Sequence, residues 1–258
     1  MDNPVETIDL LRGHKLKIYY DQCAQNPREW SNAGRLIFLG KGCNHLGDKH
    51  YSTSVDSQTG KKKRHESDLF SSQMEFLLSD DAKNAALIFV LDFRDFGSNG
   101  CRVDICQEIS GQVLAAHADA RMTEANYRND DDYLADETQY LADRFFSDWA
   151  EADGFLYITH TIVEGEWGTK PDKYGVTPLE RARRYLLGEI ETYQQWLDGD
   201  VYGFVLETPE GEEVDSCWGF YGYDWEENGI YDHIPNELIP KRLLKRIQKR
   251  TEQRRKAA

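Results

Sequence analysis

Short runs of β-branched and aromatic residues, separated by Gly, Pro, Asn and Ser, predict the strands of this protein. Two of the later runs alternate around Pro209-Glu210-Gly211 and predict a β-hairpin. A turn signal at Gly97 to Gly100 predicts another hairpin in the middle of the chain. The predicted strands are Leu16 to Tyr20, Arg35 to Gly40, Ala85 to Phe93, Cys101 to Cys106, Phe155 to Val163, Val201 to Glu207 and Val214 to Tyr221.

Longer segments repeat their apolar residues at steps of three and four, which is the spacing of an amphipathic helix. Thr177-Pro178-Leu179-Glu180 is a capping box with proline at the first helical position, and Gly199 is a stop signal, so a helix is predicted to end near Leu197. Its predicted inward-facing residues are Tyr185, Leu186, Ile190, Tyr193 and Leu197. The other predicted helices are Ser67 to Leu78, Asn129 to Asp153 and a last helix that opens at Pro240.

Together these elements predict an α+β fold, with an antiparallel or mixed sheet covered by helices and a basic helix at the C-terminus. Residues 1–240 are expected to form a single acidic α+β domain, and residues 241–258 a basic helical tail. Leu243, Leu244 and Ile247 give the tail a narrow apolar stripe that fades by Thr251, so its last turns are expected to project into solvent or toward a partner.

Charge is distributed unevenly along the chain, which has 31 Lys and Arg against 46 Asp and Glu and a formal net charge of −15. Residues 241–258 hold nine basic residues and one acid, so the remaining 22 basic and 45 acidic residues give residues 1–240 a net charge of −23. Such a body repels phosphates, and we expect it to make no direct sequence-specific contact with nucleic acid. It would attract a protein with a basic surface, although an acidic surface also serves solubility alone.

Composition places the chain among globular proteins, because 40% of its 258 residues are hydrophobic and 12% are aromatic. The five cysteines include no C-x-x-C pair, so neither a disulfide framework nor a zinc ribbon is predicted. No apolar run reaches the length of a membrane helix, and Met1 to Leu11 lacks the pattern of a signal peptide. We therefore expect a cytoplasmic protein with no membrane partner.

Two motifs resemble a family of acidic proteins of unknown function from phages and other bacterial mobile elements. The first motif is Tyr20-Asp21, then Asn26 to Gly34 (NPREWSNAG), then Leu46-Gly47-Asp48; the second is Gly188 to Phe204 (GEIETYQQWLDGDVYGF), closed by Asp215 to Gly222 (DSCWGFYG). The two segments that contain them, residues 20–48 and 188–222, cover about a quarter of the chain. This chain departs from the family at Ser31, where relatives usually carry an acid. The resemblance implies a mobile-element context, in which small acidic proteins often inhibit host defence, some by imitating DNA.

An acidic ridge is the first candidate site, because Asn129 to Asp153 carries nine acids and one base beside a helical apolar stripe. Carboxylates at steps of three and four residues would form a row able to occupy the DNA channel of a host enzyme. A solvated acidic helix has the same pattern. The residues predicted to bind the partner are Asp130, Asp131, Asp132, Asp136, Glu137 and Asp143.

A loop site in the first motif is the second candidate, because its oxygen-bearing side chains are ligands that Mg²⁺, Mn²⁺ or Ca²⁺ prefer. A water bound to such a metal would attack a phosphodiester or similar bond. The structural interpretation of the same residues is local: asparagine and aspartate cap turns, and Arg28 pairs with Glu29 or Asp48. The predicted residues of this site are Asp21, Arg28, Glu29, Asn32, Asp48 and Asp215.

The function predicted from the sequence is therefore non-enzymatic: the protein binds and inhibits a host protein through its acidic surface, in anti-defence or anti-restriction. One alternative is a divalent-metal-dependent hydrolase at the Asp21, Glu29 and Asp48 loop, and no other cofactor is expected. Another alternative is a structural or regulatory homo-oligomer. The basic tail fits docking in cis, head-to-tail pairing of two protomers, or contact with nucleic acid near the partner.

Overall fold

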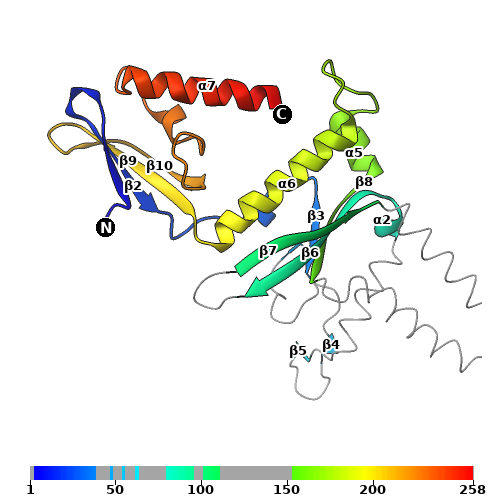
Figure 1. Ribbon diagram of the computed structural model, residues 1–258. Coiled ribbons are helices and arrows are strands. Elements are labelled where there is room, and N and C mark those ends of the chain that lie inside the picture. Colours follow the sequence, from blue (N-terminus) through cyan, green and yellow to red (C-terminus); the bar gives the residue numbers. More distant parts are fainter. Residues whose placement is uncertain are drawn as a thin grey trace, which may run out of the picture. The chain divides into compact units, whose positions relative to one another are not determined.

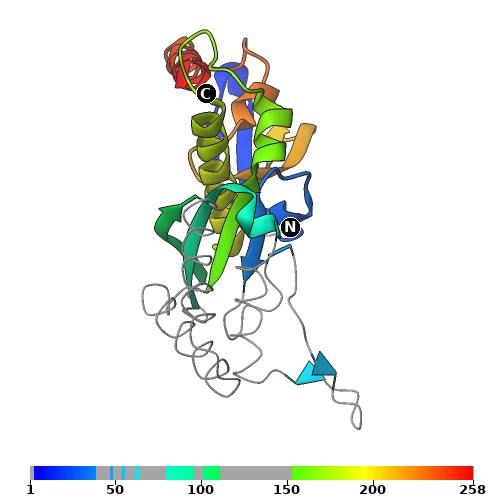
Figure 2. The same ribbon diagram turned by 90° about the vertical axis from the view of Figure 1, so that its right-hand side faces the viewer.

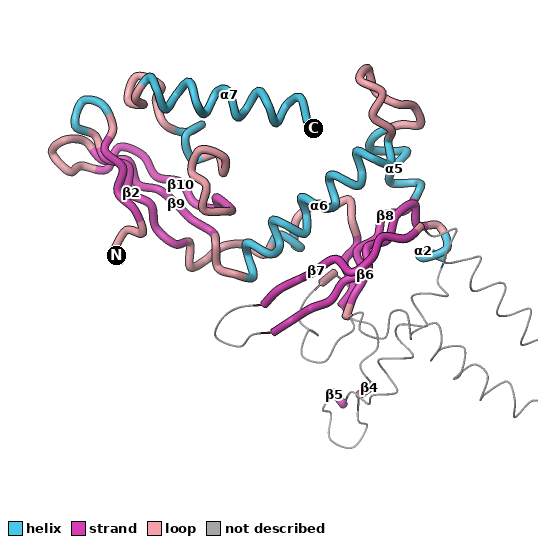
Figure 3. The backbone as a smooth tube through the Cα atoms, in the orientation of Figure 1, coloured by secondary structure: helices cyan, strands magenta, loops and turns pink. Residues whose placement is uncertain are grey.

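The computed structural model describes residues 3–38, 47–48, 54–55, 62–63, 80–95, 101–110 and 153–257 (Figure 3). The chain divides into two compact units, and each draws on separate stretches of the sequence. The terminal unit comprises Met1–Trp30, Phe96–Arg102 and Gly188–Ala258. The central unit comprises Ser31–Asp95 and Val103–Leu187.

The terminal unit is built on a four-stranded sheet in the order β1-β2-β9-β10, and its strands pair antiparallel (Figure 1). Its strands are β1 (Glu6–Asp9), β2 (Lys15–Tyr20), β9 (Val201–Glu207) and β10 (Glu213–Tyr221). The predicted hairpin is confirmed: β9 has the expected bounds, and β10 begins one residue earlier than expected. Ile18 pairs with Phe204 and Leu16 with Leu206, so the apolar positions of β2 and β9 share one face.

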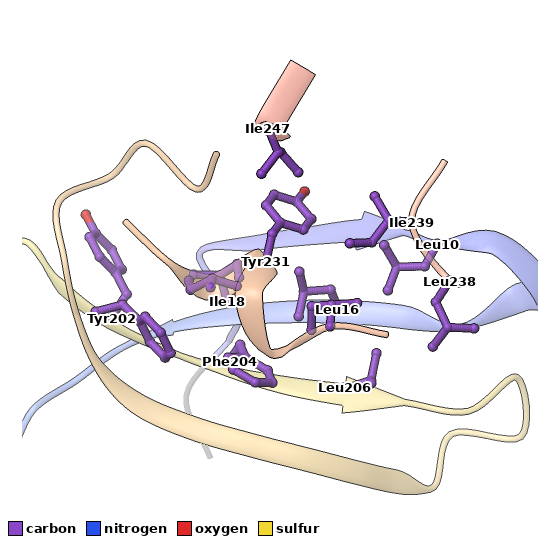
Figure 4. Close-up of a cluster of buried hydrophobic side chains, with 13 residues drawn as sticks. Leu10, Leu16, Ile18, Tyr202, Phe204, Leu206, Tyr231, Leu238, Ile239 and Ile247 are labelled. Carbon is purple, nitrogen blue, oxygen red and sulfur yellow. The ribbon is translucent and has the colours of Figure 1, made fainter. Parts of the chain in front are cut away.

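The C-terminal segment covers that apolar face of the sheet (Figure 4). The 3-10 helix η4 (Ile230–His233) contributes Ile230 and Tyr231, and helix α7 (Lys241–Ala257) contributes Ile247, which is 7% exposed. Leu243 and Leu244 of α7 pack against the same cluster. The apolar stripe of the predicted tail thus packs against the sheet, while the expectation that the last turns of the helix project into solvent or toward a partner stays a prediction.

The central unit contains a second four-stranded sheet in the order β3-β8-β6-β7. Its strands are β3 (Arg35–Phe38), β8 (Gly154–Thr159), β6 (Ala85–Asp95) and β7 (Cys101–Ile109). The first two residues of β7, Cys101 and Arg102, are assigned to the terminal unit. Residues 85–91 and 154–158 are buried throughout, as expected of strands covered on both faces. Helices α2 (Asp80–Lys83) and α5 (His160–Trp167) contact β6 and β8 (Figure 2).

The end of β8 corrects one sequence prediction, because the strand predicted over Phe155 to Val163 stops at Thr159 and helix α5 follows. The Thr159 hydroxyl accepts a hydrogen bond from the Ile162 amide at 3.5 Å, as the N-cap of α5. The Thr159 side chain therefore caps a helix inside an apolar run whose pattern predicts a single strand.

Helix α6 (Pro178–Leu197) has the predicted start and end. The Thr177 hydroxyl accepts from the Glu180 amide at 3.2 Å, and Gly199 adopts a φ of 74° beyond the C-terminus. Leu186 and Tyr193 are buried as expected. Tyr185 is 44% exposed, contrary to the prediction, and Glu189 is buried in its place on the inward face.

The α+β class is confirmed, with strands in two four-stranded sheets and helices against them. A further two-stranded ladder joins β4 (Ser54–Val55) to β5 (Lys62–Lys63), and the remaining 3-10 helices are η1 (Leu11–Gly13) and η2 (Pro27–Glu29). The helices predicted at Ser67 to Leu78 and Asn129 to Asp153 lie outside the described residues. The single domain predicted over residues 1–240 stays a prediction, since compact units need not fold independently.

None of the helices in the described part of the chain is both long enough and apolar enough to cross a membrane.

Candidate binding groove and acidic turn

The loop of the first motif begins with two local turns that its own side chains stabilise. The Asp21 carboxylate accepts a hydrogen bond from the Cys23 amide at 3.0 Å, and the Asn26 side-chain oxygen accepts one from the Arg28 amide at 2.9 Å. Pro27 occupies the first position of η2. These contacts confirm the structural interpretation for Asp21, which closes a turn.

Side chains from the second motif anchor residues 24–30, which we call the anchored loop. The Trp196 indole N–H donates to the Ala24 carbonyl at 3.3 Å, and the Tyr221 hydroxyl donates to the Gln25 carbonyl at 2.6 Å. The Trp30 ring meets the Tyr221 ring edge-on, with 5.2 Å between centroids. The two recognisable motifs, far apart in sequence, therefore meet in the terminal unit.

A buried ion pair completes this anchorage. Arg28 Nη1 lies 3.0 Å from Glu189 Oε2, and their side chains are only 3% and 5% exposed. Removing such charges from water costs several kcal/mol per ion, so each charge depends on its partner. The sequence predicts Glu29 or Asp48 as the partner of Arg28; the pattern of helix α6 does not distinguish Glu189 from the other acids of the helix, so this contact is not predicted.

Beside the anchored loop, the terminal sheet carries a groove with a volume of about 550 Å³. It lies on the terminal unit, and its aromatic residues Tyr20 and Trp218 are 55% and 49% exposed. The lining residues are Asn3, Tyr19, Tyr20, Asp21, Gln22, Cys23, Val205 and Trp218. Aromatic side chains thus meet one carboxylate in an open concave surface.

The Trp218 ring lies close against Gly203 of the neighbouring strand. Trp218 pairs in register with Gly203, where a Cβ atom would overlap the indole ring. Glycine therefore permits the ring to approach the sheet closely. Tyr19 neighbours the same ring, with centroids 6.3 Å apart and planes at 41°. The sequence signal for this arrangement was the glycine within an otherwise apolar strand.

The electrostatics around the groove favour a cationic ligand. Lys17 Nζ donates to Glu207 at 2.6 Å, which raises the pKa of the lysine and ties its charge to a carboxylate. Burial, followed by the negative charge of Asp21, raises the pKa of Tyr221. The phenol of Tyr221 therefore stays neutral at physiological pH, and Asp21 contributes the negative charge on the groove wall.

The other residues of the predicted loop site have separate roles. Asp48 extends the edge of β3: its carboxylate accepts from the Leu36 amide at 2.8 Å, and its own amide donates to the Leu36 carbonyl at 2.8 Å. Asp215 is exposed and accepts from the Ser216 amide at 2.9 Å. Glu29 is exposed, and Asn32 is half-buried in the central unit.

No group of three or more His, Cys, Asp or Glu side chains is placed to hold a metal ion among the residues that the structure describes. The predicted metal site therefore receives no geometric support there. The acidic ridge, with Asp130, Asp131, Asp132, Asp136, Glu137 and Asp143, falls in residues 111–152, outside the described part of the chain.

A second charged feature joins helix α7 to residues 224–227, which we call the acidic turn; docking in cis is one of the arrangements that the sequence left open for the basic tail, but the sequence did not identify these acids as its partners. Arg246 Nε lies 2.7 Å from Glu226, which Arg246 also contacts through Nη2. Arg250 Nη1 lies 2.8 Å from Asp224 and 3.3 Å from Glu227. The clue in the sequence was the run of acids after the last strand, opposite in charge to the tail.

Comparison with known protein families, curated proteins and solved structures finds no match for this chain.

Proposed function

We propose that this protein acts by binding, without catalysis, to a basic surface of another protein and inhibits that protein. In the mobile-element context that the sequence resemblance implies, the target is a host protein, such as a component of defence or restriction. The proposal assigns the acidic body to recognition and requires neither a metal nor a cofactor.

The observation that carries the proposal is the docking of α7 on the acidic turn. A basic amphipathic helix is held there by Ile247 in the core and by two arginines on three carboxylates. A basic segment of a partner would bind well to a surface where carboxylates surround an apolar contact. The carboxylates would attract its positive charges during the encounter, and burial of its apolar side chains would stabilise the complex. The chain's own tail thus supports the chemistry proposed for its partner.

Net charge supports the same proposal. Residues 1–240 carry a net charge of −23. The nine basic residues and one acid of the tail neutralise only part of this charge. A field of this sign raises the association rate with basic proteins at low salt and repels nucleic acid. The hydrolase alternative stays a prediction without support from the described residues, and the oligomer alternative stays a prediction as well.

The experiment compares two variants with equal loss of charge. One changes the ridge residues Asp131, Asp132, Asp136 and Asp143 to Asn, and the matched control changes exposed acids elsewhere, Glu166, Glu210, Glu212 and Glu237, to Gln. Proteins retained from a bacterial lysate are identified, and the affinity and activity of the purified partner are then measured at low and high salt.

We expect the wild type and the control to retain the same basic protein and to inhibit it, while the ridge variant loses at least about tenfold in affinity. Equal loss in both variants would mean that only net charge matters. Undiminished binding by the ridge variant, or no specific partner for the wild type, would overturn the proposal.

A further inference from the structure

We propose that the groove of the terminal unit binds an arginine side chain of a basic partner protein. This inference rests on the proposed function, which supplies the basic partner that carries the arginine. The choice of an arginine follows from Tyr19, Asp21 and Trp218, which line the groove. The groove would give the acidic protein a specific anchor point, which a diffuse negative field does not supply.

The aromatic wall provides a stacking platform. The Trp218 indole occupies the space that a Cβ at Gly203 would take, so the sheet supports the ring while 49% of the residue stays exposed. Tyr19 lies beside it with 6.3 Å between ring centroids and also lines the groove. A guanidinium group stacks well on such rings because it is planar, delocalised and weakly hydrated.

The carboxylate of Asp21 supplies the second half of the recognition. Its hydrogen bond from the Cys23 amide at 3.0 Å fixes the side chain at the groove wall. A carboxylate and a guanidinium form paired, charge-assisted hydrogen bonds, which set direction as well as strength. Two lysines of β2 share this sheet face with Tyr19: Lys17 is paired with Glu207 at 2.6 Å, and Lys15 lies opposite Glu207 in the ladder, at the other end of the strand from Tyr19.

Size and charge select the class of ligand. A volume of about 550 Å³ exceeds one side chain, so the groove accommodates an arginine together with neighbouring residues of a peptide segment. Nucleobases also stack on aromatic rings, but single-strand binders combine stacking with a basic groove, whereas here the charged group of the wall is Asp21. Lysine offers a compact, strongly hydrated charge that gains less from the indole face.

The test uses short acetylated peptides that differ only at one central position: arginine, lysine or citrulline, which keeps the shape of arginine without its charge. Binding to the full chain is measured by calorimetry. Alkylation of Cys23, an exposed thiol in the groove wall, is followed by mass spectrometry as a footprint, and exposed Cys106 of the central unit is the internal control.

We expect the arginine peptide to bind about tenfold more tightly than the citrulline peptide and to slow alkylation of Cys23 but not of Cys106. Asp21→Asn and Trp218→Leu should each remove most of this preference, while Tyr223→Leu, at an aromatic residue that is 74% exposed, should leave it unchanged. Asp21→Asn preserves volume, so it keeps the test valid if Trp218→Leu unfolds.

Equal affinity for the arginine and citrulline peptides, an arginine preference that survives Asp21→Asn, or preferential binding of a single-stranded oligonucleotide would overturn the groove assignment. Those results leave ridge-dependent capture of a partner untouched, so the inference can fail while the proposed function stands. Conversely, arginine binding in the groove without any captured partner would support the site and contradict the function.

Discussion

The buried ion pair between Arg28 and Glu189 allows a quantitative test of how the two sequence motifs hold the terminal unit together. The perturbation is Glu189→Gln, which removes one charge and nearly preserves the shape of the side chain. Because the Arg28 side chain is only 3% exposed, its charge would then be buried without the Glu189 carboxylate. Removing one member of a buried pair costs about 3–5 kcal/mol, a large part of a typical stability of about 5–15 kcal/mol.

An exposed ion pair of similar geometry serves as the control, because it differs from the Arg28–Glu189 pair mainly in its exposure to solvent. Arg183 and Glu108 of the central unit lie 2.8 Å apart, but their side chains are 40% and 39% exposed. Solvent screens such a pair, so Glu108→Gln should cost less than about 1 kcal/mol. The comparison holds the chemistry of the substitution constant and changes only the surroundings.

The assay is urea unfolding followed by tryptophan fluorescence, with a double-mutant cycle on Arg28→Met and Glu189→Met. Apolar replacement of both partners removes both buried charges, so the double variant should recover most of the stability that either single variant loses. We expect a coupling energy of about 3 kcal/mol. Additive losses, or a Glu189→Gln loss no greater than that of Glu108→Gln, would refute the argument that burial of this pair anchors the loop.

Three further outcomes follow from the terminal unit. Gly203→Ala should displace Trp218 and cost about 1–3 kcal/mol, seen as a shift in tryptophan emission and a lower unfolding midpoint; an unchanged spectrum would contradict the close approach of ring and backbone. Ile247→Ala should cost about 2–4 kcal/mol in urea unfolding, whereas a loss near zero would mean that α7 does not pack on the core. Burial raises the pKa of Tyr231 from 10.0 to about 12, so its stabilising contribution is full below pH 10 and lost as the pH rises to about 12. Tyr231→Phe should therefore lose less stability than the wild type between pH 8 and pH 11, and equal losses would exclude this cause.

The outcome at α7 also bears on the alternatives left open for the tail. Docking in cis is the arrangement in the described residues, through Arg246, Arg250 and the apolar stripe. The solvent-exposed residues of the helix include Lys241, Lys245 and Lys249. Pairing of protomers and contact with nucleic acid therefore remain predictions for that exposed surface.

Local signals were enough to predict several elements of this protein from its sequence. The alternation around Pro209-Glu210-Gly211 predicted β9 and β10. The capping box at Thr177 predicted the start of α6, and Gly199 predicted its end. These predictions succeeded because hairpin turns, caps and amphipathic periodicity depend on residues within one or two turns of each other. The α+β class followed from the same periodicities.

Tertiary structure alone decided the contacts that make the candidate sites. Arg28 and Glu189 are 161 positions apart, and no periodicity specifies which of many carboxylates a buried arginine will meet. The docking of α7 and the position of the groove depend likewise on which strands become neighbours, since β2 pairs with β9 across most of the chain. Sequence periodicity determines which face of an element is apolar, whereas the identity of the surface that covers it is a property of the whole fold.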